Sequence, residues 1–204
     1  MTQRIESQIL GSNVFVVKKK ECCVIFDTGA TVDAVRKVVG DMRVSAVFLT
    51  HGHYDHCFYA LEYAKAFGCK IYASDSIREY LLDSDKNCNE EGFCIKDFSD
   101  FVFLGCDGTL TIEGVSIQYF KLGGHTSADM IYKIGSEIFV GDLIIGRGIG
   151  RMDLYGGNKN LMASTLQFLI DLEYKTIHSG HGRDIKKVDQ VNNFAIWKKY
   201  LERY

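Results

Sequence analysis

The sequence predicts a layered α/β protein with helices outside two packed sheets, and three observations lead to this prediction. Short β-rich runs alternate with amphipathic helical stripes along all 204 residues. Apolar residues make up 47% of the chain and charged residues 25%, which allows both a sizeable core and a solvated surface. No proline- or serine-rich linker divides the sequence, so we expect one domain over residues 1–204.

The first half of the chain begins with a hairpin and continues with strand–helix–strand alternation. A lysine-rich turn separates two β-rich runs, and glycines at 40 and 68 follow two stripes with helical spacing. Alternation of this kind is typical of parallel strands joined by crossover helices. The expected strands are Asn13–Val17, Cys22–Phe26, Val44–Leu49 and Cys69–Ala73, and the expected helices are Val32–Val39 and Phe58–Phe67.

The second half returns to short strands and then to two helices. Residues 81–104 are weakly patterned, and they form either a flap over a site or a solvent-exposed connector. Residues 109–145 contain short strands with glycine turns. Apolar spacing predicts a helix over Leu161–Leu172, a strand over Tyr174–Ile177 and a final helix over Val188–Leu201.

Composition argues against several classes of partner and location. The formal charge is 24 − 26 = −2, which gives no general attraction to nucleic acid or to an anionic membrane. Apolar runs such as Ala46–Leu49 are far shorter than the roughly 20 residues of a membrane span. No signal peptide is evident, and the seven cysteines include no CxxC pair. We therefore expect a cytoplasmic protein with reduced thiols.

The segment Thr50-His51-Gly52-His53-Tyr54-Asp55-His56 concentrates metal-binding side chains between a predicted strand and a predicted helix. His51 and His53 are two positions apart in extended chain, so their side chains face the same way. Asp55 and His56, where the chain turns into the helix, point to a second position nearby. So many imidazoles beside a carboxylate are costly to crowd together without a cation.

Three later segments place a histidine or an aspartate beside glycine after a β-like run. They contribute His125, Asp142 and His181, and the glycines allow a close approach of the backbone. His178 lies three residues before His181 within a predicted strand end, where packing is the simpler role. The sequence thus offers seven candidate ligands, which are more than one tetrahedral ion needs.

Two metal sites that share one carboxylate fit this number of ligands. Neither set is a closed cysteine cage, so each can keep an open position for water, as catalytic sites do. Imidazole nitrogen and carboxylate oxygen suit zinc, and they also suit iron or manganese. We therefore expect two divalent metal ions, most simply Zn. The first set is His51, His53, His125 and Asp142, and the second is Asp55, His56, His181 and Asp142.

At these residues the sequence resembles the metallo-β-lactamase superfamily. The resemblance runs from Asp27 to Gly182 and rests on the THxHxDH motif and on the ordered His, Asp and His segments that follow it. It implies an αββα sandwich with the metals at one edge, between the sheets. It also implies the same ligand assignment, with Asp27 of the Asp-Thr-Gly strand end supporting the ligand loop.

A second stretch narrows the resemblance to one branch. Gly141-Asp142 and the segment from Gly148 to Gly157 are similar to the GD…GxGRxDxxGG stretch of glyoxalase II-like proteins. This similarity implies a metallohydrolase of the hydroxyacylglutathione hydrolase type, which cleaves thioesters. The expected partner is a small-molecule acyl substrate, while the acyl group, the thiol carrier and the oligomeric state stay open.

The expected reaction uses a metal-bridging hydroxide to attack the thioester carbonyl. Asp55 and Asp142 are the expected catalytic carboxylates, and Asp55 orients the hydroxide or takes up its proton. Arg147 and Arg151 are candidate contacts for a substrate carboxylate, because guanidinium groups form bidentate pairs. Arg151 is equally suited to a structural pair with Asp153.

Other functions use similar ligands and stay open at this point. A persulfide dioxygenase would hold a single iron on His51, His125 and Asp142 and leave the second set idle. A lactonase would use the same two metals on a different acyl compound. A metal-binding scaffold without catalysis is the remaining alternative, although every ligand of a catalytic site is present.

Overall fold

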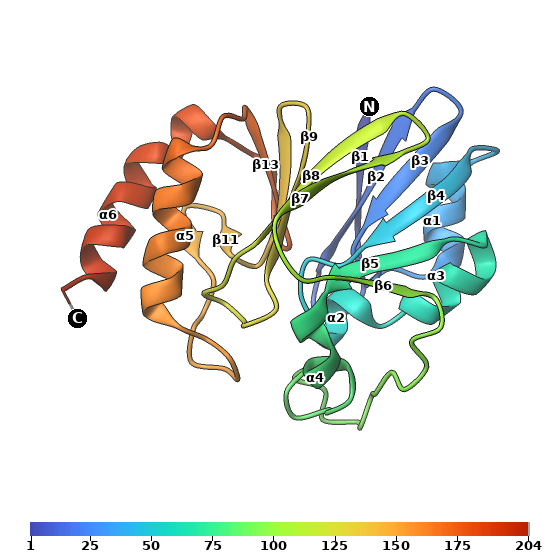
Figure 1. Ribbon diagram of the computed structural model, residues 1–204, viewed down its shortest axis with the longest axis horizontal. Coiled ribbons are helices and arrows are strands. Elements are labelled where there is room, and N and C mark those ends of the chain that lie inside the picture. The colour runs from blue at the N-terminus through green and yellow to red at the C-terminus, as the bar shows by residue number, and fades with distance from the viewer. Residues whose placement is uncertain (204) are drawn as a thin grey trace.

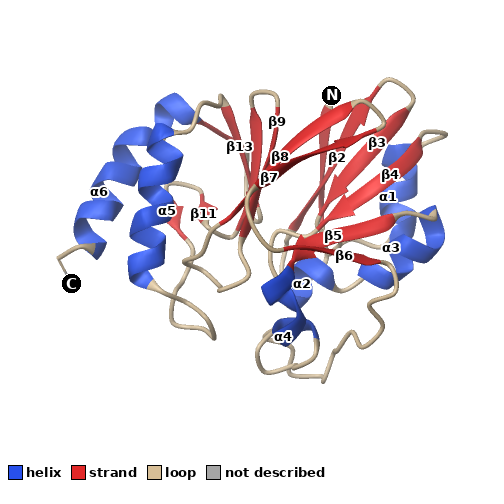
Figure 2. Ribbon diagram, in the orientation of Figure 1, coloured by secondary structure: helices blue, strands red, loops and turns tan. Residues whose placement is uncertain are grey.

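The computed structural model describes residues 1–203 and contains two six-stranded sheets packed face to face, with helices on both outer faces. Figure 1 shows α5 and α6 on one side of the sandwich and α1 and α3 on the other. Figure 2 shows the two sheets between these helical layers. The αββα sandwich expected from the sequence is confirmed.

The first sheet has the strand order β1-β2-β3-β4-β5-β6. Neighbours are antiparallel from β1 to β3 and parallel from β3 to β6. Short helices follow the parallel strands, as crossover connections require. The elements of this half are β1 (Thr2–Glu6), β2 (Asn13–Lys19), β3 (Cys22–Phe26), α1 (Val32–Val39), β4 (Arg43–Phe48), α2 (Tyr54–Cys57), α3 (Ala60–Phe67), β5 (Lys70–Ser74), a 3-10 turn (Asp75–Ile77), α4 (Arg78–Leu81) and β6 (Phe101–Leu104).

The second sheet has the strand order β14-β13-β10-β9-β8-β7. Only the β10–β13 pair is parallel, and α5 connects these two strands. The elements of this half are β7 (Gly108–Ile112), β8 (Val115–Lys121), β9 (Met130–Ile134), β10 (Glu137–Gly141), the hairpin β11 (Ile144–Ile145) and β12 (Gly148–Ile149), α5 (Lys159–Asp171), β13 (Thr176–Ser179), β14 (Ile185–Lys186), a 3-10 turn (Lys187–Asp189) and α6 (Val191–Leu201).

The strand β2 shows why both faces of each sheet are apolar. Val14 and Val16 face the helical layer over the first sheet, whereas Phe15 and Val17 face the space between the sheets. This alternation follows from the two-residue period of a strand. The two sheets meet through stacked aromatic rings, of which Phe26 and Phe139 have centroids 3.8 Å apart. A third apolar cluster packs α5 and α6 against the second sheet.

The structure differs from the sequence prediction in three segments. Thr2–Glu6 forms an edge strand that was not expected, and its alternation carries only one large apolar residue, Ile5. Phe101–Leu104 is also a strand, within a region predicted as weakly patterned. The helix predicted from Phe58 to Phe67 begins at Ala60 as α3, because Tyr59 leaves helical geometry with φ −96° and ψ 18°, and the separate short helix α2 precedes it.

No helix within residues 1–203 has the length and apolar character needed to cross a membrane. The seven cysteines are all free thiols, and four of them are buried. Burial raises the pKa of the Cys23 and Cys69 thiols to about 11, which keeps both protonated and unreactive.

Candidate metal centre

All seven predicted ligands come together at one edge of the sandwich. His51 and His53 follow β4, and Asp55 and His56 lie on the short helix α2. From the second sheet, His125 follows β8, while Asp142 and His181 follow the parallel strands β10 and β13. The carboxyl ends of parallel strands meet at the same sheet edge, and this explains why residues so distant in sequence converge.

His51, His53 and His125 form the first group, whose ligand atoms lie within 4.8 Å of one another. His53 Nδ1 lies 2.9 Å from His125 Nε2. His51 Nε2 and His53 Nε2 are buried without a hydrogen-bond partner. Buried polar atoms are rarely left unpaired, so these nitrogens indicate a cation or a water that they would hold.

Asp55, His56 and His181 form the second group. Asp55 Oδ2 lies 3.4 Å from His56 Nε2 and 3.2 Å from His181 Nε2. The two imidazole nitrogens are 3.4 Å apart. Zinc bonds of about 2.0–2.2 Å in tetrahedral geometry separate ligand atoms by about 3.3–3.6 Å. The three distances therefore match one face of a tetrahedral zinc site.

Asp142 lies between the two groups. Its Oδ1 is 3.4 Å from His56 Nε2, and its Oδ2 is 3.4 Å from His181 Nε2 and 3.8 Å from His125 Nε2. Asp142 Oδ1 has no hydrogen-bond partner although the carboxylate is buried. This position between the groups is the one that a shared carboxylate requires.

Asp27 orients two of the imidazoles through hydrogen bonds. Asp27 Oδ2 accepts from His56 Nδ1 at 2.9 Å and from the Thr50 hydroxyl at 2.8 Å, and Asp27 Oδ1 accepts from the Thr50 amide. Because the Thr50 hydroxyl donates to Asp27, its oxygen is free to accept from His51 Nδ1 at 3.1 Å. Because these contacts use the Nδ1 atoms of His51 and His56, the Nε2 atoms of both imidazoles are left for the centre. Metal-binding histidines are commonly oriented in this way by a hydrogen bond from the other ring nitrogen.

A third imidazole is oriented by the backbone. His125 Nδ1 donates to the Arg151 carbonyl at 2.8 Å, which leaves Nε2 for the centre. Its own amide donates to Asp129 Oδ2 at 2.9 Å, and this buried carboxylate also accepts from the Thr126 amide. Asp129 thus fixes the turn that presents His125.

Close backbone packing requires glycine at Gly180. A Cβ atom there would overlap Asp142 Oδ1 and would lie 2.7 Å from His56 Cε1. Gly141 combines a left-handed φ of +54° with a close approach to Thr50. The glycines noted beside the ligands in the sequence therefore create the space in which both groups meet.

The charges of the centre fit a divalent cation. Burial and neighbouring imidazoles lower the pKa of His51 and bring that of His53 to about 3, so both are neutral, as metal ligands must be. Hydrogen bonds to Asp142 and Asp55 raise the pKa of His181 to about 9. Burial opposes ionisation of Asp55, but His56 and His181 hold its pKa well below the usual range. Without a metal, the proton on His181 balances these buried carboxylates, and a bound cation would replace that proton.

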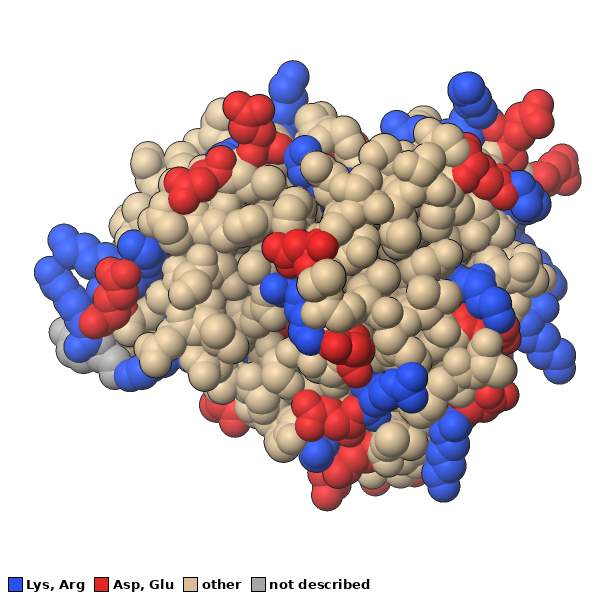
Figure 3. All heavy atoms as spheres, viewed as in Figure 1, with Lys and Arg blue, Asp and Glu red and all other residues tan. Residues whose placement is uncertain are grey.

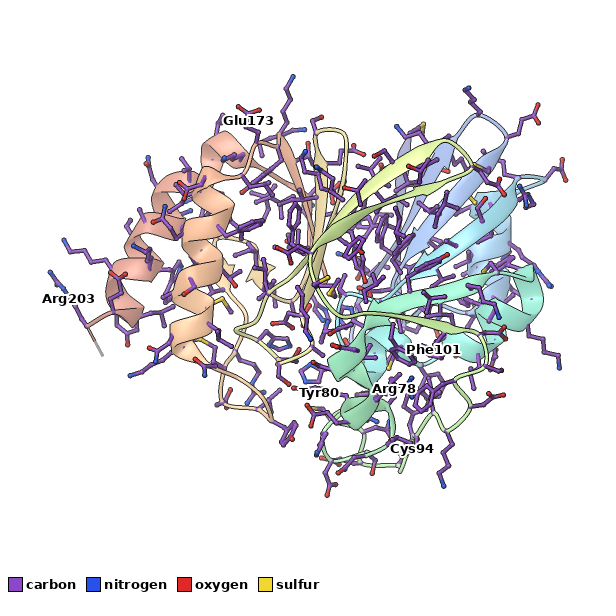
Figure 4. The ribbon with its side chains drawn as sticks, in the orientation of Figure 1. Arg78, Tyr80, Cys94, Phe101, Glu173 and Arg203 are labelled. Carbon is purple, nitrogen blue, oxygen red and sulfur yellow. The ribbon has the colours of Figure 1, made fainter. Side chains whose placement is uncertain are left out.

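The two groups open on one pocket of about 650 Å³. Figure 4 shows Tyr80, a neighbour of this pocket, at the lower edge between the sheets. Its hydroxyl bonds with the Ser127 hydroxyl at 2.9 Å and so joins the two halves beside the centre. The lining residues are Ile9, Leu10, His53, Tyr54, Asp55, Phe58, Tyr59, Cys88, Asn89, Glu90, Glu91, His125, Asp142, Arg151, Leu154 and His181.

The two arginines that the sequence singled out occupy different places. Arg151 lines the pocket and forms a bidentate pair with Asp153, at 2.8 Å from Nε and 2.7 Å from an amino nitrogen. Arg147 is exposed on the β11–β12 turn and is not among the lining residues. Its carbonyl accepts from Trp197 Nε1, so the turn packs on α6 rather than beside the pocket. His178 stacks on Phe139 and pairs with Asp184, away from the centre.

Several residues that build the centre were not found from the sequence. The Ser12 hydroxyl donates to the Asp55 carbonyl at 2.7 Å, and Ser12 also forms an isolated bridge with His181. The Asn13 side chain donates to the carbonyls of Ser179 and Gly182. These contacts tie the start of β2 to the second sheet. No local pattern marks Ser12 or Asn13, because their partners lie 43 to 169 residues away.

The model of the metallo-beta-lactamase superfamily matches residues 8–181, which include all seven residues of the centre. This chain belongs to that superfamily. It is 26% identical over 199 residues to the probable metallo-hydrolase YqgX of Bacillus subtilis, covering 91% of this chain and 94% of the relative. It is also 26% identical over 133 residues to the hydroxyacylglutathione hydrolase GloC of Haemophilus influenzae, covering 62% of each protein.

Solved structures share the fold of this superfamily member. The BLEG-1 B3 metallo-beta-lactamase matches with a TM-score of 0.85 at 24% identity, over 94% of this chain and 97% of that one. ETHE1 from Myxococcus xanthus matches with a TM-score of 0.72 at 16% identity, over 98% and 91%. The chain is thus a metallo-hydrolase superfamily enzyme with a histidine and aspartate cluster suited to metal.

Proposed function

We propose that this protein is a dinuclear metallohydrolase that cleaves a thioester of a small acyl compound. The observation that carries the proposal is the pair of complete ligand groups that share Asp142 and open on one pocket. The similarity to GloC, named as a hydroxyacylglutathione hydrolase, supports the choice of a thioester. The GD…GxGRxDxxGG stretch supports the same branch.

The residues of the centre fit two divalent cations, and zinc is the proposed metal. Imidazole and carboxylate ligands suit zinc, although iron and manganese accept them as well. His51, His53 and His125 would hold one ion, Asp55, His56 and His181 would hold the other, and Asp142 would contact both. When bound, such a pair acidifies a water toward neutral pH and polarises a carbonyl.

Asp55 is the carboxylate that we propose orients the attacking water. Its carboxylate lines the pocket, and its Oδ2 lies 3.4 Å from His56 Nε2 and 3.2 Å from His181 Nε2. The low pKa of Asp55 keeps it ionised and ready to orient a water by accepting a hydrogen bond. The thiol that leaves has an ordinary pKa of about 8.5, so it departs as a thiolate without a dedicated acid.

The surface agrees with a small-molecule partner. On the face in Figure 3, basic and acidic side chains are interspersed and form no broad area of one sign. A protein that binds nucleic acid concentrates positive charge on one face. We therefore retain a small acyl compound as the proposed partner. The seven free cysteines support the cytoplasm, a reducing compartment, as the proposed location.

A persulfide dioxygenase and a lactonase are the alternatives. The dioxygenase would need one iron on His51, His125 and Asp142. The short distances among Asp55, His56 and His181 favour a second ion instead. A lactonase would use the same two ions, so substrate tests must separate it from a thioesterase.

Elemental analysis of the purified protein, combined with a substrate panel, tests the proposal. We expect about two metal ions per chain and hydrolysis of thioesters above lactones, with no oxygen uptake on glutathione persulfide. Asp142→Ala should lower thioester turnover more than 100-fold, since it removes the shared carboxylate. The control Asp189→Asn lies on an exposed turn and should retain activity. Turnover that survives both chelation and Asp142→Ala would overturn the proposal.

A further inference from the structure

The mouth of the pocket carries two carboxylates that the chemistry at the metal centre does not use. Cys88, Asn89, Glu90 and Glu91 line the pocket from the loop between α4 and β6. Glu90 and Glu91 are exposed to solvent. No salt bridge involves either of them within residues 1–203, and their charge is therefore not neutralised by a neighbouring side chain.

The loop that carries these carboxylates is fixed to the body of the protein. The side chain of buried Asn87 donates to the backbone carbonyls of Tyr80 and Phe93. The backbone carbonyl of Asn87 accepts from the Tyr54 amide. The Asn89 side chain accepts from the amides of Glu91 and Phe93. The acidic pair is thus held beside α2 at a set position.

The other charges at the mouth do not offset the acidic pair. Outside the metal centre, Arg151 is the cation among the lining residues, and Asp153 already pairs with it through two hydrogen bonds. The remaining walls include Ile9, Leu10, Phe58 and Leu154. Leu10 is 66% exposed, so its apolar surface is available to a bound molecule. The mouth is therefore apolar in part and acidic in sum.

We propose that Glu90 and Glu91 select thioesters whose thiol carrier is uncharged or positively charged, and disfavour anionic carriers such as glutathione. This inference rests on the proposed thioesterase function. Water supplies the oxygen that bonds to the acyl carbon as the carbon–sulfur bond breaks. The thiolate leaves with that electron pair, and the protons of water are shared between the released acid and the medium.

The expected size of the preference follows from Coulomb interactions at a wet surface. Two carboxylates several ångströms from the carrier act in nearly aqueous dielectric, and salt screens them over about 10 Å. We expect kcat/KM for a cationic carrier to exceed that for an anionic carrier about tenfold at low ionic strength. The ratio should fall toward one as salt is raised.

Three butanoyl thioesters that differ in carrier charge test the proposal with the metal-loaded protein. Thiocholine carries a permanent positive charge, N-acetylcysteamine is neutral and 3-mercaptopropionate is negative. The double variant Glu90→Gln, Glu91→Gln should reduce the ratio of cationic to anionic kcat/KM to about one. The matched control Glu173→Gln, Glu202→Gln changes the charge equally. Figure 4 places Glu173 at the upper edge, away from Tyr80, so the control should keep the wild-type ratio.

A binding measurement separates this inference from the proposed function. Thioether analogues of the three substrates cannot be hydrolysed, and NMR titration of the zinc-loaded protein reports their relative affinities. We expect the cationic thioether to bind more tightly, and the Gln variant to lose that preference. Equal or tighter binding of the anionic thioether would overturn the inference. If none of the thioesters is hydrolysed, the proposed function fails, and the thioether titration still decides the role of the acidic pair.

Discussion

His181 and Asp142 reach the second group from the ends of neighbouring parallel strands. Removing each of them should have a different effect on the number of metal ions bound. His181 contacts only the second group, whereas Asp142 contacts residues of both groups. A change at His181 should therefore affect one ion, and a change at Asp142 should affect both. This difference distinguishes a shared carboxylate from an ordinary ligand.

His181→Ala should reduce the metal content from about two ions to about one per chain, because the first group stays complete. Plasma emission spectrometry of dialysed protein measures the ratio. His178→Gln is the control, since it changes an imidazole on β13, the strand that precedes His181, and this imidazole packs on Phe139 instead of facing the centre. Retention of two ions by His181→Ala would contradict the assignment of this residue.

Gly180→Ala should disrupt the centre without removing any ligand. The added methyl group would overlap Asp142 Oδ1 and crowd His56, so we expect metal affinity to fall at least tenfold. Competition with a chromophoric chelator measures the affinity. Gly148→Ala is the control, because the nearest atom to its added methyl group is 3.5 Å away. Equal affinities in both variants would argue against the tight packing described here.

Among the elements, the loop from α4 to β6 depends on one buried side chain. Asn87→Ala removes two hydrogen bonds to the carbonyls of Tyr80 and Phe93, of which the Tyr80 carbonyl keeps a backbone donor. We expect a loss of about 1–3 kcal/mol in the free energy of unfolding. Urea titration measures this loss, and exposed Asn192→Ala on α6 should change it by less than about 0.5 kcal/mol. An unchanged free energy of unfolding in Asn87→Ala would show that the loop is held by other contacts.

The elements that the sequence predicted well are those with a strong apolar period. The strands β2 and β3 were expected because they are buried on both faces and form continuous apolar runs, and the helices α1 and α5 were expected because each buries one apolar face. The strand β1 was missed because its burial is partial, and β6 was missed because its pairing with β5 is long-range. Residues 81–104 were predicted to form either a flap or a connector, and residues 88–91 of this segment line the pocket.

The candidate site was predictable to the extent that it lies in local motifs. His51 to His56 stand together, and glycines mark His125, Asp142 and His181. The contact between Ser12 and Asp55 joins segments 43 residues apart, so no local pattern indicated it. Asn87 and Asn89 bond to residues nearby in the chain, but they lie in a stretch that shows no regular apolar period. Arg147 was expected near the substrate and lies on a turn against α6 instead.

For the whole molecule, a metal pair would join the two sheets. Four of the ligands come from the first half and three from the second, so bound ions stabilise the packing of one sheet on the other. Ligand binding at about 1,000 times its Kd adds about 4 kcal/mol to the free energy of unfolding. In a chain of this size, that gain corresponds to about 10 °C in Tm.

Chelation should therefore lower the Tm by about 10 °C, and zinc added back should restore it. Differential scanning calorimetry measures the shift. In His181→Ala the shift should be smaller, because one ion has already been lost. An unchanged Tm after complete removal of metal would show that the sheets are held by apolar packing alone.

The split of the ligands between the two sheets also sets an order for assembly during synthesis. A ribosome delivers His51 to His56 early, then His125 and Asp142, and His181 last. The second group is incomplete until β13 has emerged and paired with β10. Before His181 has emerged, a nascent chain can therefore assemble at most one complete set of ligands. Binding of the second ion is a late event that coincides with closure of the sandwich.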